Sequence, residues 1–288
     1  MYKTVLHEQL KQELQLVRDK RAFNAQNWIQ KKCESLNEYM RNAKLSGIVV
    51  SVSGGIDSTV TAALASKASL MPNSPIKKIL LLQQPIHSTK SIVDRAQLLK
   101  TLDNVTLTEI DQTEIFDSLK AVVNKAVGIT GKHFADGNLR SYMRTPSGFY
   151  VAQLLCQEGY PAIVIGTGNF DEDGYLYYFS KAGDGISDVQ LIHDLHKSEV
   201  YIVAKAMNLH PDLVGAVPSA DLWPGQTDED EIGWSYDAVE LWVETMNNTD
   251  AIKAKLCPEA LEQYNKMGER LSSIHKKNAH KGQISKGI

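Results

Sequence analysis

Only three cysteines occur among the 288 residues, and Cys33, Cys156 and Cys257 form no Cys-x-x-Cys pair. This sparse usage suggests a reducing, cytoplasmic setting. No stretch approaches the roughly 20 apolar residues that a membrane-spanning helix needs, and residues 1–20 lack the apolar core of a secretory signal. The formal net charge of −3 gives no global reason to expect a nucleic-acid partner.

Two common nucleotide-binding motifs are also missing. The sequence has no Gly-x-x-x-x-Gly-Lys-Ser/Thr loop, which excludes a Walker-type NTPase, and no Gly-x-Gly-x-x-Gly opening a helix, which disfavours a Rossmann dinucleotide site. No repeat, low-complexity tract or linker divides the chain. We therefore expect a single domain over residues 1–288, in which residues 1–46 form a helical N-terminal extension.

Short apolar runs alternate with amphipathic segments along the chain. Strands are predicted at residues 48–52, 78–83, 105–111 and 162–166, and helices at residues 25–44, 58–69, 92–102, 114–127, 139–157 and 197–207. Runs of β-branched residues as short as 48–52 are typical of buried parallel strands. The alternation predicts an α/β fold, a doubly wound parallel sheet with helices on both faces.

The segment from Ser51 to Ser58 reads Ser-Val-Ser-Gly-Gly-Ile-Asp-Ser and lies between a predicted strand and a predicted helix. Glycines let the backbone approach a ligand closely, and the amides at a helix start make an anion cradle. Asp57 would repel a bare phosphate, so its presence suggests a bridging cation such as Mg²⁺. The alternative is a plain Gly-Gly turn in which Asp57 and Ser58 only cap the helix; the strand–turn–helix setting favours phosphate binding.

This turn resembles the pyrophosphate loop of the N-type ATP pyrophosphatases, which grip the β,γ-phosphates of ATP and transfer AMP to a substrate oxygen. Three further segments are similar to the ammonia-dependent NAD synthetases within that group. They are residues 165–172 with 177–185 and Asp188, residues 218–222 with 224–233 and 235–237, and Gly137-Asn138 followed by a basic residue. Together the resemblance covers about residues 25 to 280 and implies an adenine nucleotide alpha hydrolase-like fold.

The resemblance implies that ATP and ammonia convert deamido-NAD (nicotinic acid adenine dinucleotide) to NAD through an acyl-adenylate, in a homodimer. ATP contacts are implied for Ser51, Val52, Ser53, Gly54, Gly55, Ile56, Asp57, Ser58, Thr167, Lys197 and Ser219, and Mg²⁺ ligation for Asp57 and Glu172. Deamido-NAD contacts are implied for Asn138, Tyr142, Lys181, Asp188, His275 and Lys276, and catalytic roles for Asp57, Lys181 and Asp184.

Taken singly, these residues also have plainer interpretations. Glu172 lies between two aspartates and fits a solvated acidic loop equally well. Lys181 and Lys197 are single lysines, and most such lysines lie on the surface. Thr167 and Ser219 fit turn or cap positions. The combined order and spacing of the segments favours the functional interpretation.

The sequence departs from the family pattern at positions that bear on substrate geometry. Tyr142 stands where the first substrate-contacting arginine is expected, and tyrosine cannot make a bidentate charged clamp. Gln83 replaces a usual arginine, and Ile186 replaces the last glycine of a Gly-Asp-Gly-Gly run. Two alternatives stay open: another pyrophosphate-loop adenylating enzyme with a different acceptor, and a nucleotide-binding regulator without catalysis.

The source of ammonia follows from the length of the N-terminal part. Glutamine-dependent relatives carry a separate amidase domain with a catalytic cysteine. The roughly 45 residues before the first predicted strand are too few for such a domain. We therefore expect no glutaminase domain, and the use of free ammonia or of ammonia from a partner protein.

Overall fold

The computed structural model describes residues 5–219 and 227–283. Five parallel strands form one sheet in the order β3-β2-β1-β4-β5. The strands are β1 (Gly47–Ser51), β2 (Lys78–Gln83), β3 (Thr106–Glu109), β4 (Ala162–Gly166) and β5 (Val189–Gln190). From β1 the chain first adds β2 and β3 on one side of the sheet and then β4 and β5 on the other. The carboxyl end of β1 is therefore a topological switch point, the place where open α/β sheets bind ligands.

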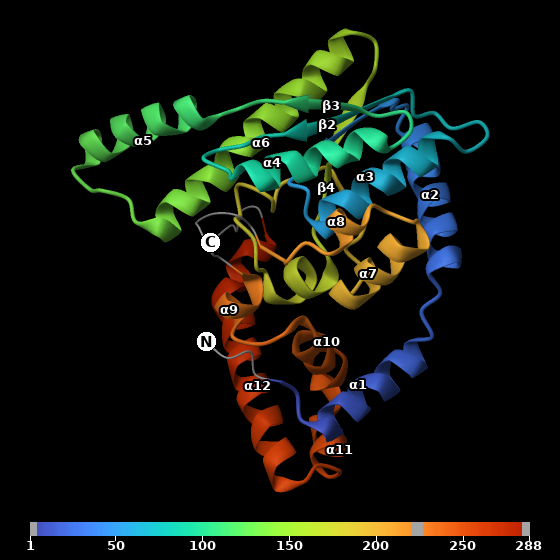
Figure 1. Cartoon of the computed structure of the whole chain (residues 1–288), viewed down its shortest axis with the longest axis vertical. Coiled ribbons are helices and arrows are strands. Elements are labelled where there is room, and N and C mark those ends of the chain that lie inside the picture. Colours follow the sequence, from blue (N-terminus) through green and yellow to red (C-terminus); the bar gives the residue numbers. More distant parts are fainter. Residues whose placement is uncertain (1–4, 220–226, 284–288) are drawn as a thin grey trace.

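Helices make up most of the remaining chain (Figure 1). The α-helices are α1 (Glu8–Arg21), α2 (Ala25–Asn42), α3 (Ile56–Ser69), α4 (Lys90–Gln97), α5 (Thr113–Val127), α6 (His133–Gln157), α7 (Lys197–Ala206), α8 (Pro211–Val214), α9 (Asp228–Ile232), α10 (Tyr236–Thr245), α11 (Thr249–Lys253) and α12 (Pro258–Asn278). Shorter helices are η1 (Leu98–Thr101), the π-helix η2 (Phe170–Leu176), η3 (Met246–Asn248) and η4 (Ala279–Gly282). Among the helices within the described ranges, none is both long and apolar enough to cross a membrane.

Alternate residues of the strands face opposite sides of the sheet. Ile48 and Val50 of β1 join a core shared with α2, α3 and α7. Val49 faces the other side and packs with Ala152 and Leu155 of α6. Because both faces are buried, the strand has to be apolar throughout. The predicted doubly wound α/β class is confirmed.

A second core lies below the sheet in Figure 1 and is built from α1, α10 and α12. Leu10 and Leu14 of α1 are buried in it, as are Tyr175 and Leu176 at the end of η2. The two halves of the predicted N-terminal extension therefore join different cores: α2 belongs to the core that includes β1, α3 and α7, and α1 belongs to the helical core. The segment η2 lies where the two cores meet.

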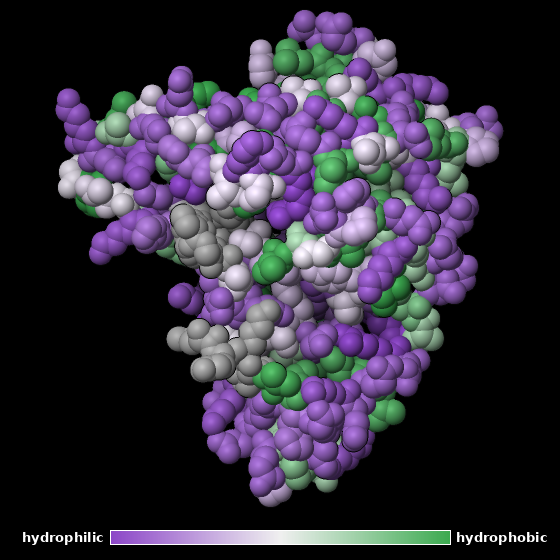
Figure 2. Space-filling model, viewed as in Figure 1, coloured by the Kyte–Doolittle hydropathy of each residue, from purple (hydrophilic) through white to green (hydrophobic). Residues whose placement is uncertain are grey.

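Helices α10 and α12 were not among the predicted elements, and α6 is longer than predicted. The start of α6 shows one reason for such differences. This helix begins at His133 rather than at residue 139, because Gly137 and other weak helix formers hide its first turns. It also continues through Pro146. The first part of α6 forms with α5 a hairpin that projects from the body in Figure 1, and the rest of α6 packs on the sheet. The face shown in Figure 2 is largely hydrophilic, with apolar residues scattered along it.

Gly54 allows a close approach between two elements. Its φ is +77°, and a Cβ at this position would lie 2.9 Å from the backbone nitrogen of Ala96 in α4. Gly128 has a similar φ of +70°, but a Cβ there would meet nothing within 4 Å. The two glycines share the conformational constraint and differ only in the space around them.

We predict that Gly54→Ala lowers the free energy of unfolding by roughly 2–4 kcal/mol. The cost of a left-handed backbone and the cost of the clash between the new Cβ and the Ala96 backbone add together. The matched control Gly128→Ala should lose only about 1–2 kcal/mol, the cost of the left-handed conformation alone. Urea denaturation of the two variants measures the difference. Equal losses would show that the contact with α4 does not constrain Gly54.

Candidate active site

A cleft of about 620 Å³ opens at the carboxyl ends of β1 and β4, within the size range of small-molecule sites. Most of the residues predicted to bind ATP or metal line this one cleft. They are Ser51, Val52, Ser53, Gly55, Ile56, Asp57, Ser58, Thr167, Glu172, Lys197 and Ser219. Asp184, predicted to be catalytic, lines the same cleft. Residues 220–226, part of the signature between Pro218 and Asp237, lie outside the described residues.

The loop after β1 is fixed by short polar contacts. The Ser53 hydroxyl oxygen accepts a hydrogen bond from the Gly55 amide at 3.2 Å, and the Ser58 hydroxyl donates to the Gly55 carbonyl at 3.1 Å. Arg95 of α4 donates to the Gly54 carbonyl at 2.9 Å. Helix α3 begins at Ile56, and the first amides of a helix have no intrahelical acceptors. The loop therefore presents the start of a helix, with its positive dipole end, to the cleft.

Lys197 is the central cation of the cleft. Its ammonium nitrogen lies 2.6 Å from Asp57 Oδ2 and 2.8 Å from Glu172 Oε1. The lysine side chain is 3% exposed, and each of the two carboxylates is 18% exposed. Asn169 completes the group by donating to Asp57 Oδ1 at 3.0 Å. A buried ammonium is tolerated only when it is paired in this way.

The three charges shift one another's pKa values in different directions. Burial favours neutral Lys197, but Asp57 and Glu172 outweigh it and raise the lysine pKa. Burial would also raise the pKa of Glu172, yet the charge and hydrogen bond of Lys197 lower it overall. For Asp57 the effect of burial prevails over Lys197, and its pKa is raised. Lys197 therefore stays protonated and Glu172 ionised.

Tyr236 extends the cluster to a further carboxylate. Its hydroxyl donates to Glu172 Oε1 at 2.5 Å and lies 3.1 Å from Asp228 Oδ2. The Lys197 ammonium lies 4.8 Å from the centre of the Tyr236 ring, a cation–π distance. Burial, aided by the charge of Glu172, raises the pKa of Asp228 to about 7. Tyr236 thus joins α10 and α9 to the acids of the cleft.

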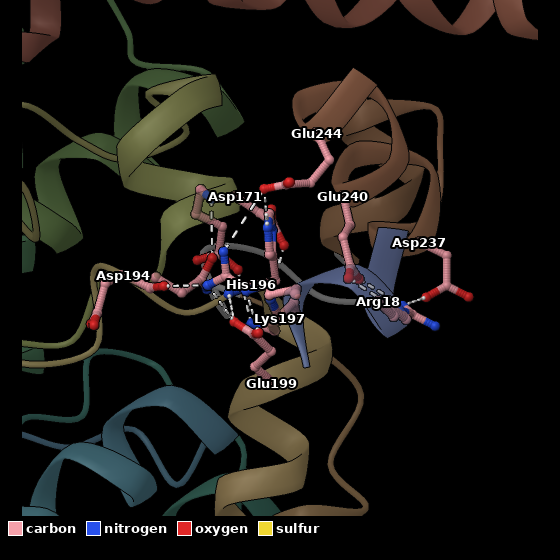
Figure 3. Close-up of polar contacts among 12 residues, drawn as sticks. Arg18, Asp171, Asp194, His196, Lys197, Glu199, Asp237, Glu240 and Glu244 are labelled. Carbon is pink, nitrogen blue, oxygen red and sulfur yellow. Dashed lines mark hydrogen bonds and ion pairs between the residues drawn. The ribbon is translucent and has the colours of Figure 1, made fainter. Parts of the chain in front are cut away.

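A buried ion pair involves the chain neighbours of Glu172 and Lys197 and lies at the start of α7 (Figure 3). Asp171 Oδ1 lies 2.7 Å from His196 Nδ1, and Asp171 Oδ2 accepts a hydrogen bond from the Lys197 amide at 2.8 Å. Both side chains are fully buried. Glu244 of α10 lies 3.0 Å from His196 Nε2. Since Asp171 accepts two hydrogen bonds as a carboxylate, we assign the shared proton to His196.

The predicted substrate-contacting residues are placed less uniformly, and none of the six lines the cleft. Lys181 donates to the His280 carbonyl at 3.1 Å, and His275 stacks on Tyr175 with its Nδ1 2.7 Å from the Tyr175 carbonyl oxygen. The remaining four are Asn138, which accepts from Ser180, Tyr142, which is 39% exposed, Asp188, which accepts from the Val164 amide, and Lys276, which lines a separate shallow depression.

Asp57 and Glu172 are the carboxylates predicted to hold Mg²⁺. Within residues 5–219 and 227–283, no three His, Cys, Asp or Glu side chains gather at one metal position. Asp57 and Glu172 nevertheless converge on one cation, the Lys197 ammonium. Mg²⁺ is usually held by one or two carboxylates together with substrate phosphates. The pair therefore fits a metal that arrives with a nucleotide.

Several residues of this cluster carry no distinctive signal in the sequence. Asn169 and Asp171 flank Phe170 in a stretch that looks like an acidic loop, and His196 follows a leucine without any local motif. Tyr236 lies within a segment noted only for its resemblance. Their partners are 25 to 112 residues away in the chain, so only the fold reveals the contacts.

The pH dependence of stability tests the assignment of the proton to His196. Burial lowers the pKa of His196, but the hydrogen bond and charge of Asp171, with Glu240 and Glu244, raise it from 6.5 to about 9. A raised pKa contributes stability that is fully present below pH 6.5 and is lost as pH rises through 9. The shift corresponds to roughly 3 kcal/mol.

We predict that the free energy of unfolding falls by up to that amount between pH 6.5 and pH 9.5, and that His196→Gln loses most of this slope. Denaturant titrations of both proteins at several pH values measure the difference. Parallel pH profiles for the two proteins would show that His196 is not the titrating group.

Comparisons with known proteins agree with this geometry. The NAD synthase family model matches residues 28–285. The NH(3)-dependent NAD(+) synthetase of Alkaliphilus oremlandii is 37% identical over 227 residues, covering 77% of this chain and 86% of the relative. Among solved structures, the NMN synthetase of Francisella tularensis superimposes with a TM-score of 0.74 at 27% identity, covering 92% of this chain and 99% of that chain.

The fold is also that of the NH3-dependent NAD synthetase of Campylobacter jejuni, which covers 92% of this chain and 99% of its own with a TM-score of 0.69 at 24% identity. The family match spans the β1 loop, Glu172 and Lys197, which line the cleft, and Tyr236, which donates a hydrogen bond to Glu172. The resemblance seen in the sequence is confirmed, and the chain belongs to the NAD synthase family.

Proposed function

We propose that this protein is an ATP-dependent ligase that amidates deamido-NAD with ammonia, forming NAD, AMP and pyrophosphate. One observation carries the proposal: in a member of the NAD synthase family, the loop after β1, Asp57, Glu172 and Lys197 meet in one cleft. Such a cleft offers main-chain donors and one buried cation to a polyphosphate. Phosphoryl transfer depends mainly on positioning and charge neutralisation of this kind.

The reaction proceeds in two steps. The carboxylate of the substrate attacks the α-phosphorus of ATP, the bond between that phosphorus and the α,β-bridging oxygen breaks, and the β- and γ-phosphates leave as pyrophosphate. Ammonia then attacks the carbonyl carbon of the acyl-adenylate, AMP leaves, and one proton is released. In the first step the amides at the start of α3 bind the departing pyrophosphate, and Lys197 neutralises negative charge beside Asp57 and Glu172.

Asp184 is the group proposed to take the proton from ammonia. It lines the cleft and is hydrogen-bonded to the Ser141 hydroxyl of α6. Thr145 of the same helix donates to the Gly183 carbonyl at 3.1 Å, so α6 holds this turn in place. Lys181 lies near the turn, where its contact with the His280 carbonyl ties it to the C-terminal segment.

Mg²⁺ belongs to the proposal as well. Asp57 and Glu172 would hold it, and the ion would supply charge neutralisation across the phosphates of ATP. Lys197 already pairs with one oxygen of each carboxylate. The two acids therefore serve both cations, and their own negative charges keep the cleft from being strongly positive before ATP arrives.

A second candidate is the amidation of nicotinic acid mononucleotide. Two observations favour it: the likeness to a protein described as an NMN synthetase, and Tyr142 at the position where the family pattern has a substrate-contacting arginine. Losing a bidentate donor weakens recognition of a second phosphate. The reaction chemistry is the same in both candidates, and only the acceptor differs.

The test is pyrophosphate release by the full chain with ATP, Mg²⁺ and ammonium, with either deamido-NAD or nicotinic acid mononucleotide added. We expect release with the dinucleotide, and an amide product only when ammonium is present. Higher kcat/KM with the mononucleotide would select the second candidate. Absence of turnover with both acceptors would contradict the proposed ligase.

In the same assay Glu172→Gln should lower kcat/KM by at least about 100-fold, since it removes a charge beside the transferring phosphoryl group. Glu158→Gln, an exposed site at the end of α6, is the matched control and should keep wild-type turnover. Wild-type turnover of Glu172→Gln would remove this carboxylate from the mechanism.

We also propose that the protein forms a homodimer through the α5–α6 hairpin. Only Phe116 of α5 is buried, while Ile115, Val122 and Val127 are 60%, 66% and 60% exposed. Phe134 at the start of α6 is 75% exposed. Several exposed apolar side chains on one hairpin are a feature of interaction surfaces. A second copy is the occupant implied by the family resemblance.

Sedimentation velocity at micromolar concentration tests the interface. We expect a dimer for the wild type and a shift to monomer for Val122→Asp, because a charge would be buried at the contact. Leu16→Asp, at an apolar residue of α1 that is 58% exposed, should remain dimeric. A monomeric wild type would contradict the proposed dimer, and a dimer that both variants preserve would place its interface elsewhere.

A further inference from the structure

Arg21, the last residue of α1, reaches from the helical core to the start of α7. Its Nε and Nη2 atoms donate to the two carboxylate oxygens of Glu199 at 2.5 and 2.8 Å. Nη2 also donates to the Asp194 carbonyl oxygen at 2.9 Å. The Glu199 side chain is only 4% exposed. This bidentate contact is directional and fixes both partners.

Glu199 is itself part of the start of α7. Its Oε2 atom accepts a hydrogen bond from the backbone amide of His196 at 3.0 Å, as in a capping box. Lys197 follows His196 in the chain, and its backbone amide donates a hydrogen bond to Asp171. Arg21 therefore binds both ends of the segment Asp194–Glu199, and Asp171 binds His196 and Lys197 in its middle.

The Lys197 ammonium depends on that segment for its position. Lys197 is the first residue of α7, and its side chain is buried between Asp57 and Glu172. A shift at the start of α7 would move the ammonium relative to both carboxylates. Misplacement of a reacting group by about 1 Å can cost roughly 100-fold in rate.

We propose that Arg21 is a positioning residue: by clamping the start of α7 it sets where the Lys197 ammonium lies between the two carboxylates of the cleft. Arg21 precedes the part of the chain that the family model matches, which begins at residue 28. The inference thus assigns a role in the site to the N-terminal helix. It rests on the proposed function where turnover is the readout.

Arg18 provides a matched control on the same helix. It lies one turn earlier, donates to both oxygens of Glu240 at 3.0 and 2.6 Å, and reaches Asp237 at 2.6 Å. The Glu240 side chain is 2% exposed. Figure 3 shows Arg18 between these two acids of α10, away from the His196–Lys197 end of α7. Removing either arginine unpairs one buried glutamate and weakens the docking of α1.

The experiment compares Arg21→Met with Arg18→Met in the full chain, using steady-state turnover and hydrogen exchange of the peptide spanning residues 194–203. We expect Arg21→Met to lower kcat by roughly 10- to 100-fold and to speed exchange at the start of α7. Arg18→Met should keep kcat within about 2-fold and leave that exchange unchanged. Arg21→Lys should be intermediate, because lysine cannot bind both oxygens in a fixed plane.

Equal losses of kcat in the two methionine variants would overturn the inference, since they would report only the docking of α1. Wild-type kcat in Arg21→Met would overturn it too. If Arg21→Met does not fold, Glu199→Gln takes its place and should show the same loss of kcat and the same local exchange. Hydrogen exchange needs no substrate, so it tests the clamp even when the wild type fails to turn over either acceptor.

Discussion

The buried ammonium of Lys197 is the constraint on which the rest of the site depends. An amine that is 3% exposed has to be paired with carboxylates, and its two partners come from α3 and from η2, at residues 57 and 172. Helix α3 follows β1, η2 follows β4, and Lys197 begins α7. The pairing therefore requires the ends of β1 and β4 to lie close to the start of α7. The parallel sheet meets this requirement, because β1 and β4 are neighbours and their carboxyl ends lie side by side.

The second core explains how acidic residues are kept in this position. Helix η2 buries Tyr175 and Leu176 among α10 and α12, and its Glu172 lies in the cleft. The π-helical winding changes the angle between successive side chains, and such turns are frequent at functional sites. Tyr236 of α10 then reaches back to Glu172. The site therefore lies at the boundary between the sheet core and the helical core, and residues of both cores contact its charged groups.

The central strands could be predicted from the sequence because their signal is local. The strands at 78–83 and 162–166 were predicted with the bounds that the structure has, since a fully buried strand needs a continuous apolar run. The two residues of β5 and the seven of η2 have no such run. The turn after β1 was likewise predicted from Gly54 and Gly55. The first turns of α6 were not predicted, because they contain weak helix formers.

The candidate site was only partly predictable. Asp57 followed from the glycine turn, but Glu172 and Lys197 followed from the family resemblance, because single acids and lysines look like surface residues. The Asp171–His196 pair and the Arg21–Glu199 clamp span 25 and 178 residues. Long-range polar contacts leave no periodic pattern in a sequence, so they emerge only once the fold brings the elements together.

The most direct test is a crystal structure of the full chain with Mg²⁺ and a non-hydrolysable ATP analogue. The account predicts the phosphates on the backbone amides of residues 53–58, with Lys197 still within hydrogen-bonding distance of Asp57 and Glu172. Nucleotide bound away from this loop, with the cleft between β1 and β4 empty, would contradict it.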